Sequence, residues 1–203
     1  MADAPTGDSK ARARPIRVLA LGGSTRAESS GGHALRIAAE GAQAAGAQTE
    51  IISGRALLLP LYDTESPERD DAVRAMVDAV RRADGLIVVS PGYHGGISGL
   101  VKNALDYIED LRDDPRPYLE GRAVGCIAVA HGWQAAVTTL HQIRQVVHAL
   151  RGWPTPFGAA VNSSLVRLDD LPAGDSVIDQ LHLVGRQVVE FARMRRSFDG
   201  ETA

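Results

Sequence analysis

Short apolar segments that alternate with helical periodicity constrain the fold of this chain more than any other feature. Ile16 to Leu21, Gly85 to Ser90 and Ala123 to Val129 are almost entirely apolar, which is typical of strands buried on both faces of a parallel sheet. Gln48 to Ile52 and Phe157 to Val161 are two further expected strands. The intervals between these segments are long enough to hold helices.

Apolar residues recur at helical spacing in these intervals and after the last strand. The expected helices cover residues 35–45, 70–83, 98–111, 134–150 and 177–193, with an irregular crossover over residues 53–69. Strands that alternate with helices pair in parallel, because each crossover returns the chain to the same edge of the sheet. We therefore predict an α/β fold: a doubly wound five-stranded parallel sheet of order 2-1-3-4-5 with helices on both faces.

The length of the chain favours a single domain. With 203 residues and 44% apolar content, it can bury one sizeable core. We expect this domain to span residues 16–196, with a C-terminal tail over residues 197–203. Residues 1–15 mix polar and small side chains without the apolar run of a signal peptide, so we expect a disordered N-terminal tail.

Charge and composition exclude several classes of partner. The net charge of -3 comes from 22 basic and 25 acidic residues, which gives no field suited to nucleic acid or an anionic membrane. No segment approaches the ~20 consecutive apolar residues that span a bilayer. Cys126 is the only cysteine, so it has no internal disulfide partner and fits a reducing, cytoplasmic location. Small molecules or copies of the same chain are the expected partners.

A ligand site is expected where the connections from the first and third strands leave in opposite directions. In a sheet of this order, the divergence opens a crevice at the carboxyl ends of those two strands. The segments that border the crevice are Gly22 to Gly32 and Pro91 to Ile97, and both are rich in glycine and poor in apolar residues. Topology and composition therefore point to the same place.

The first of these loops has the composition of a phosphate site. It supplies hydroxyl groups, the guanidinium of Arg26 and the N–H groups of a helix start, all of which bind anions. It lacks the Gly-x-Gly-x-x-Gly spacing of a dinucleotide turn and the Gly-Lys-Ser/Thr of a Walker loop. A flexible serine-glycine turn with a solvated Arg26 is the alternative, and it stays open at this point.

The second loop suits a flat ligand. Gly95 and Gly96 follow Tyr93 and His94, and consecutive glycines let the backbone approach a planar ring while its N–H groups donate hydrogen bonds. An isoalloxazine ring fits this description, because backbone donors and the helix start near Ser98 would favour the negative charge of the reduced ring. The alternative is a glycine turn shaped only for packing.

Three motifs carry a resemblance to a known family. They are GSTR at 23–26 followed by Ser29 and Ser30, PGYHGGISGLVKNALD at 91–106, and AHGWQA at 130–135. In these motifs the chain resembles the NADPH-dependent FMN reductase family of the flavodoxin-like superfamily, over roughly residues 16–162. The resemblance implies a flavodoxin-like fold with bound FMN, and a homodimer or homotetramer with contacts through the helices that follow the third and fourth strands.

The resemblance also implies which residues bind FMN. The first loop would hold the phosphate, the second would border the ring, and the third motif would line its far side. The expected FMN-binding residues are Ser24, Arg26, Ser29, Ser30, Gly31, Gly32, Pro91, Gly92, Tyr93, His94, Gly95, Gly96, Gly132 and Trp133. Two positions depart from the family's pattern: Gly31 offers no side chain to the phosphate, and His131 adds polarity near the ring.

The activity implied by the resemblance is that of an NAD(P)H-dependent FMN oxidoreductase. Hydride would pass from NADPH or NADH to FMN, and electrons would then pass to a small acceptor. No catalytic side chain is expected, because the flavin carries the chemistry and the protein positions the reactants. The alternatives are a quinone, azo-dye or metal-oxyanion reductase that uses bound FMN, a non-enzymatic flavodoxin-like electron carrier, and a domain that has lost FMN and serves only in assembly.

Other chemically suggestive residues have simpler interpretations. Cys126 lies within an expected strand and is interpreted as a buried structural thiol. His141 and His148 lack the one-turn spacing of a zinc pair, so no metal site is expected. Lys102 and Asp106 are one helical turn apart and should form an ion pair. The final cluster, Arg193, Arg195 and Arg196, is interpreted as a solvated helix end, with a nucleotide-phosphate role as the weaker alternative.

Overall fold

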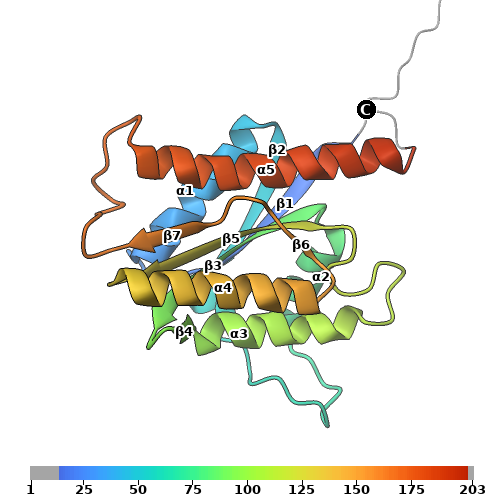
Figure 1. The fold of residues 1–203 in the computed structure, drawn as a ribbon. Helices are drawn as coiled ribbons and strands as arrows, with labels where there is room; N and C mark the ends of the chain where they lie inside the picture. Colours follow the sequence, from blue (N-terminus) through green and yellow to red (C-terminus); the bar gives the residue numbers. More distant parts are fainter. Residues whose placement is uncertain (1–13, 201–203) are drawn as a thin grey trace, which may run out of the picture.

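A computed structural model describes residues 14–200 as three layers, with a mixed but mainly parallel sheet between two layers of helices. Figure 1 shows α1 (Ser30–Ala44) and α5 (Ser176–Phe198) on one face of the sheet and α3 (Gly99–Asp106) and α4 (Trp133–Ala149) on the other. Each face has its own apolar core: α1 and α5 contribute to one, and α2 (Asp71–Arg82), α3 and α4 to the other. The predicted α/β fold with helices on both faces is confirmed.

The main strands have the predicted order. They are β1 (Ile16–Gly22), β2 (Ala47–Ser53), β3 (Gly85–Tyr93), β5 (Ala123–Ala130) and β7 (Ala159–Asn162). All neighbouring pairs among them are parallel, in the order β2-β1-β3-β5-β7. This arrangement is the expected 2-1-3-4-5 order.

Within residues 14–200, the sheet has two short strands in addition to the five predicted ones, which makes seven. The short β4 (Gly96–Ile97) pairs antiparallel with the end of β3. The short β6 (Trp153–Pro154) pairs with the beginning of β5, while β7 pairs with its end. Pro154 and Pro156 lie in or between these two edge segments, and proline cannot donate a ladder hydrogen bond. A continuous edge strand is therefore broken into two pieces.

The helices differ from the prediction mainly at their ends. They are α1 (Ser30–Ala44), α2 (Asp71–Arg82), α3 (Gly99–Asp106), α4 (Trp133–Ala149) and α5 (Ser176–Phe198). The helix expected over residues 98–111 is α3 followed by the 3₁₀ helix η2 (Tyr107–Leu111). A second 3₁₀ helix, η1 (Gly54–Leu57), lies in the expected irregular crossover. Residues 1–13 of the predicted N-terminal tail and residues 201–203 of the C-terminal tail lie outside the described residues.

Side-chain caps explain where four helices begin. The side chains of Ser29, Asp70, Ser98 and Asp175 each accept a hydrogen bond from a backbone N–H in the first turn of α1, α2, α3 and α5. Such bonds satisfy N–H groups that have no partner within the helix. The start of α1 at Ser30, ahead of the expected residue 35, follows from the Ser29 cap.

The two ends of the described chain meet at Asp84, which is 7% exposed and lies just before β3. Its carboxylate accepts hydrogen bonds from the guanidinium of Arg14 at 2.9 and 3.0 Å, from the backbone N–H of Arg17 at 2.8 Å, and from Arg196 at 2.6 Å. Burial alone would raise the pKa of Asp84, but these bonds and charges outweigh it and hold the pKa below its usual value. The interpretation of Arg196 as a solvated helix end was wrong, because its side chain is only 14% exposed.

Three simpler predictions have clear outcomes. Cys126 is buried, as predicted, and burial raises the pKa of its thiol to about 12. Lys102 and Asp106 form the expected ion pair, with 2.5 Å between Nζ and Oδ1. Among the described residues, no helix combines the length and the apolar character needed to cross a membrane.

The contact between α1 and α5 depends on two glycines. A Cβ atom on Gly185 would lie 2.0 Å from the backbone oxygen of Ala38, and one on Gly41 would lie 2.5 Å from the Cα atom of His182. The two helix backbones therefore touch directly, with no room for a methyl group on either side. Packing at this distance is possible only with glycine at these positions.

We predict that Gly185→Ala destabilises the protein. Alanine favours helix by about 1 kcal/mol over glycine, but the clash with Ala38 should reverse that sign and lower the free energy of unfolding by about 1–3 kcal/mol. Urea denaturation provides the measurement. Arg186→Ala, at the exposed neighbouring position, is the control and should change the value by less than about 0.5 kcal/mol; a stabilised Gly185→Ala would refute the close contact.

Candidate functional site

A cavity of about 540 Å³ lies at the carboxyl ends of β1, β3, β5 and β7. It is at the position expected from the divergence of the connections after β1 and β3. Its lining residues are Ser24, Thr25, Arg26, Ser29, Ser30, Gly31, Pro91, Gly92, Tyr93, His94, Val129, Ala130, His131 and Ser163. The two glycine-rich loops singled out in the sequence therefore face one space.

The loop between β1 and α1 begins with two glycines that the local backbone requires. Gly22 has a φ of +139°, and a Cβ atom there would lie 1.9 Å from the backbone oxygen of Val89 in β3. Gly23 has a φ of +90°, and its N–H donates to the same oxygen at 3.0 Å. These features bend the chain sharply out of the sheet, so that the following loop lies over the carboxyl ends of β1 and β3.

The wall formed by this loop and the start of α1 is suited to an anion. Ser29 Oγ accepts the backbone N–H of Gly32 at 3.1 Å and so fixes the first turn of α1. Ser30 and Gly31 lie in that turn and line the cavity; N–H groups there have no partner within the helix. Arg26 also lines the cavity, is exposed, and makes no hydrogen bond or ion pair with another described residue. A cation and backbone donors thus converge on one end of the cavity.

The second loop is more regular than the sequence suggested. Gly92 pairs with Ile97, and Tyr93 with Gly96, across a two-residue turn at His94 and Gly95. The turn residues have φ angles of 53° and 80°, as in a type I′ turn, in which both central residues are left-handed. The segment is therefore a tight hairpin of β3 and β4, and its Pro91 to His94 side lines the cavity.

Helix α4 holds this hairpin in place through Gln142. Its side-chain nitrogen donates to the carbonyl oxygen of Gly95 at 3.1 Å, and its side-chain oxygen accepts the N–H of Ile97 at 3.2 Å. The hydroxyl of Thr138, one turn earlier, lies 3.1 Å from the same Gly95 oxygen and 2.8 Å from the carbonyl oxygen of Gln134, so its one hydrogen can be donated to either acceptor. Neither residue was predicted from the sequence. Their spacing of four places them on one helix face, but that spacing does not indicate which segment the face contacts.

The remaining wall comes from the ends of β5 and β7. Val129, Ala130 and His131 line it from β5, and Ser163 lines it immediately after β7. Thr25, Val129, Ala130 and Ser163 also line the cavity but were not among the residues predicted from the sequence. The ends of parallel strands at one edge of a sheet are a general signal for such residues. Asn162, next to Ser163, is buried and accepts hydrogen bonds from the backbone and hydroxyl of Ser164, which shapes the turn.

The structure brings nine of the fourteen expected residues to the cavity wall, and five lie outside the lining: Gly32, Gly95, Gly96, Gly132 and Trp133. Gly32 is buried in the first turn of α1, and Gly95 and Gly96 lie at the far side of the hairpin. Gly132 and Trp133 begin α4, and Trp133 is 55% exposed. Within residues 14–200, no group of three or more metal-ligating side chains is arranged to hold a metal ion.

The sequence also matches a family of known proteins. A model of the family described as NADPH-dependent FMN reductase matches residues 16–164. An NADPH azoreductase from Bacillus sp. (strain OY1-2) is 35% identical over 86 residues, which are 42% of this chain and 45% of the relative. A quinone reductase from Escherichia coli (strain K12) is 29% identical over 92 residues, 44% of this chain and 47% of the relative. The chain thus spans about half the length of the curated relatives it matches.

Solved structures show the same fold. FerB from Paracoccus denitrificans, a flavoenzyme NAD(P)H:(acceptor) oxidoreductase, superposes with a TM-score of 0.73 at 15% sequence identity. The match covers 89% of this chain and 98% of FerB. At 15% sequence identity, this similarity establishes a shared flavodoxin-like architecture. It gives no information about the ligand.

We predict that Gln142→Ala loosens the hairpin that lines the cavity. The substitution removes the hydrogen bonds to Gly95 and Ile97, each worth about 1 kcal/mol, so the Ile97 amide should exchange its hydrogen about tenfold faster or more. Hydrogen–deuterium exchange provides the measurement. Gln145→Ala, at an exposed position of the same helix, is the matched control, and equal exchange rates in both variants would show that Gln142 does not hold the hairpin.

Proposed function

The chain belongs to the NADPH-dependent FMN reductase family, and from this premise we propose that it binds FMN and passes electrons from NAD(P)H to a small acceptor. The observation that carries the proposal is the 540 Å³ cavity, which has an anion-binding loop at one end and a glycine-containing hairpin at the other. This arrangement suits a ligand with a phosphate at one end and a flat ring at the other.

The loop before α1 would hold the phosphate. Arg26 supplies a positive charge with no partner among the described side chains, and Ser24 and Ser30 supply hydroxyl groups beside it. Ser29 already accepts the N–H of Gly32 through its side-chain oxygen. Its hydroxyl hydrogen can still donate to a phosphate oxygen, because a hydroxyl accepts and donates at once.

The hairpin and the end of β5 would border the ring. When bound, FMN supplies the redox chemistry: it accepts hydride from a nicotinamide and returns electrons to an acceptor. Pro91, Gly92, Tyr93 and His94 would position the ring from one side. The protein's part is to orient the reactants and keep the hairpin rigid, so we propose no side chain as an acid or base.

The acceptor is proposed as a small electron-poor molecule such as a quinone or an azo compound. Two relatives support this class, because their names are those of an azoreductase and a quinone reductase. The alternative of a non-enzymatic electron carrier predicts strong acidity for docking to redox proteins. The net charge of -3 on 203 residues does not favour it.

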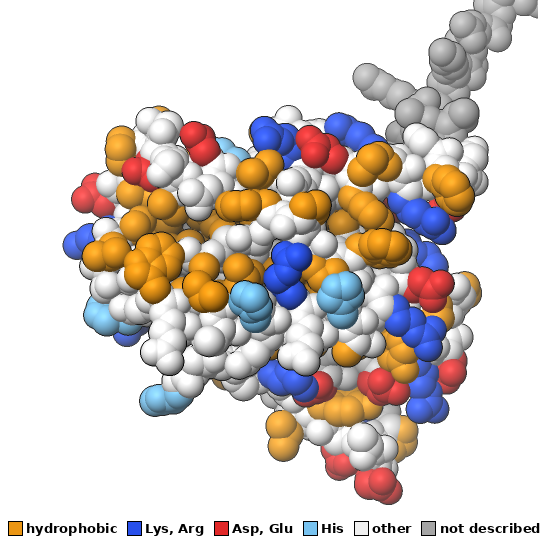
Figure 2. All heavy atoms as spheres, in the orientation of Figure 1, with side chains coloured by type: hydrophobic (Ala, Val, Ile, Leu, Met, Phe, Trp, Pro, Cys, Tyr) orange, Lys and Arg blue, Asp and Glu red, His pale blue; other side chains and the backbone are white. Residues whose placement is uncertain are grey.

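We also propose that the protein works as a homo-oligomer in the cytoplasm. Apolar side chains gather across the face that Figure 2 presents. Trp153 and Met194, which line one apolar pocket together with Phe191, are 59% and 63% exposed. Exposed apolar patches of this kind mark contact surfaces between proteins. The cytoplasmic location rests on the single buried Cys126, which suits a reducing compartment.

The proposed activity predicts that NADPH bleaches the yellow protein. FMN-loaded protein mixed with NADPH in an anaerobic stopped-flow instrument should lose the absorbance of oxidised flavin and regain it when a quinone is added. A non-enzymatic carrier would stay yellow after addition of NADPH. Persistent yellow colour with both NADPH and NADH would refute the reductase proposal.

The proposed phosphate contact predicts a selective effect of Arg26→Gln. Loss of one charge-assisted hydrogen bond costs about 1.5–3 kcal/mol, so the Kd for FMN should rise about 10–100-fold. Riboflavin, which has no phosphate, should bind with unchanged affinity. Fluorescence titration with both flavins provides the measurement. Arg36→Gln, which removes an exposed arginine of α1 that pairs with Glu28, is the control; an equal loss for both flavins would contradict the phosphate assignment.

A further inference from the structure

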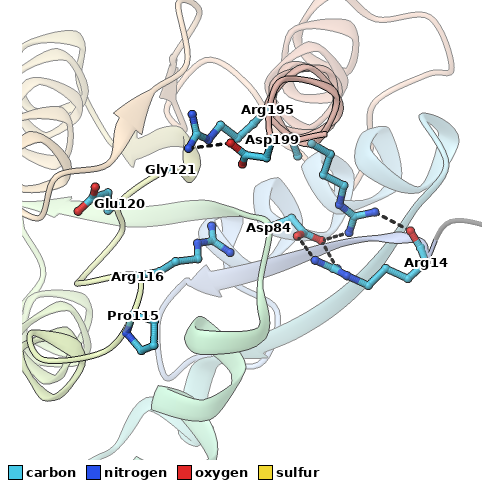
Figure 3. Close-up of a pocket in the computed structure, with 10 residues that line it drawn as sticks. Arg14, Asp84, Pro115, Arg116, Glu120, Gly121, Arg195 and Asp199 are labelled. Carbon is cyan, nitrogen blue, oxygen red and sulfur yellow. Dashed lines mark hydrogen bonds and ion pairs between the residues drawn. The ribbon is translucent and has the colours of Figure 1, made fainter. Parts of the chain in front are cut away.

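A second cavity, which we call the arginine cavity, lies at the opposite edge of the sheet from the proposed FMN site. Its volume is about 270 Å³, and it is lined by Arg14, Asp84, Pro115, Arg116, Glu120, Gly121, Ala192, Arg195, Arg196 and Asp199. These residues precede β1, β3 and β5 or belong to the last turns of α5 and the residue after it. Figure 3 shows arginine side chains entering the space from α5, from the start of the chain and from the segment before β5.

Positive charge exceeds negative charge in this cavity. Asp84 is shared by Arg14 and Arg196, and Asp199 pairs with Arg195 at 3.1 Å. Arg116 makes no hydrogen bond or ion pair with any residue of the described chain. Glu120 lies within 3.8 Å of Arg151, which is outside the cavity.

A further arginine beneath the cavity increases the imbalance. Arg122 is 1% exposed and donates hydrogen bonds to the backbone oxygens of Ala83, Tyr118 and Arg81 at 3.0–3.1 Å. These acceptors are neutral, so they satisfy its N–H groups without balancing its charge. Arg116 and Arg122 are therefore two guanidinium groups at or next to the cavity that form no ion pair with a described residue.

The surroundings oppose this excess charge. Burial, together with the neighbouring charge of Arg116, lowers the pKa of Arg122 to about 10. Burial and the charges of Arg14 and Arg195 also lower the pKa of Arg116, against the opposing effect of Asp84. Both arginines stay charged near neutral pH, so a bound anion would remove an electrostatic cost.

Gly121 keeps the centre of the arginine cavity open. It has a φ of +70°, and the position that its Cβ would take is 3.7 Å from Nε of Arg195 and 3.9 Å from Nη2 of Arg116. Two guanidinium groups from different elements therefore converge on one point, beside a residue without a side chain. Guanidinium groups arranged in this way recognise oxyanions, because their planar N–H groups match the spacing of the oxygens.

We propose that the arginine cavity binds a dianionic phosphate group, held between Arg116 and Arg195. The two charges of the ligand match Arg116 and Arg122, which form no ion pair with a described residue, and the cavity leaves room for inorganic phosphate or for the phosphate of a small phosphomonoester. The bound group would connect the segment before β5 to α5. The site is independent of the FMN cavity, so it needs no assumption about catalysis.

The test compares thermal unfolding of the protein in low-millimolar phosphate and in chloride at matched ionic strength, with FMN in excess. At about 100 times the Kd, phosphate should raise the Tm of the unmodified protein by about 5–10 °C. Arg116→Gln should lose this response. Without phosphate, the same variant should be at least as stable as the unmodified protein, because it removes a repelling charge. If Arg116 had only a structural role, the variant would be less stable than the unmodified protein under the same conditions.

Two controls separate the site from other effects of phosphate. Arg112→Gln removes an exposed arginine that pairs with Asp113 and Glu109 and should keep the full response. Arg26→Gln should also keep it, which distinguishes the arginine cavity from the FMN phosphate loop. An equal response in Arg116→Gln would assign the stabilisation to general salt effects and overturn the proposal.

Isothermal titration calorimetry with inorganic phosphate and with glycerol 3-phosphate shows whether the site binds free phosphate or the phosphate group of a phosphomonoester. Binding of either compound with one site per chain, lost in both Arg116→Gln and Arg195→Gln, supports the proposal. Binding of glycerol 3-phosphate alone assigns the site to a phosphomonoester. Absence of binding by both compounds overturns it.

Discussion

The direct backbone contact between the end of β1 and β3 is the constraint on which the candidate site depends. Gly22 and Gly23 lie against the carbonyl oxygen of Val89, so closely that even one methyl group on Gly22 would overlap it. The contact makes the chain leave β1 at a fixed angle, and it sets the height of the next loop above the sheet. The phosphate-type loop and the β3–β4 hairpin therefore face each other across a cavity of defined width.

Features that depend on local sequence could be predicted. The apolar strands, the helical periodicity and the glycine-rich loops indicated the parallel sheet, its order and the edge at which the cavity lies. Each of these signals is contained in a few consecutive residues, as in Gly85 to Ser90 or Gly22 to Gly32. The topology alone predicted that the loop with Arg26 and the loop with Tyr93 and His94 border the same space.

Features that depend on contacts between distant segments were missed. In the sequence, Gln142 is an ordinary polar residue on an amphipathic helix. Its contact with the hairpin, which lies more than forty residues earlier in the chain, forms only in the folded structure. Arg196 has the same sequence context as a solvated helix end, yet its partner is Asp84 at the start of β3. Periodicity identifies which face of a helix is buried but does not identify the polar group that a given side chain will meet.

Charged residues at the two edges of the sheet have different partners. At the carboxyl edge, Arg26 and backbone N–H groups of the first turn of α1 face a cavity. At the amino edge, Asp84 binds two arginines from opposite ends of the described chain and thereby fixes α5 against the beginning of β1. The phosphate-type loop can change its ligand without disturbing this second cluster, because the full length of the sheet separates them.

The interrupted edge formed by β6 and β7 has a consequence for how copies of the protein can associate. Pro154 and Pro156 remove N–H donors from the outermost segment of the sheet, so a strand from another molecule finds no continuous ladder to extend. Uncontrolled edge-to-edge growth into aggregates is disfavoured on this side, even though Trp153 and Met194 expose apolar surface beside it. A specific contact between two copies of the protein on this side must therefore depend on side chains. Single substitutions can change such a contact without breaking the hydrogen bonds of the sheet.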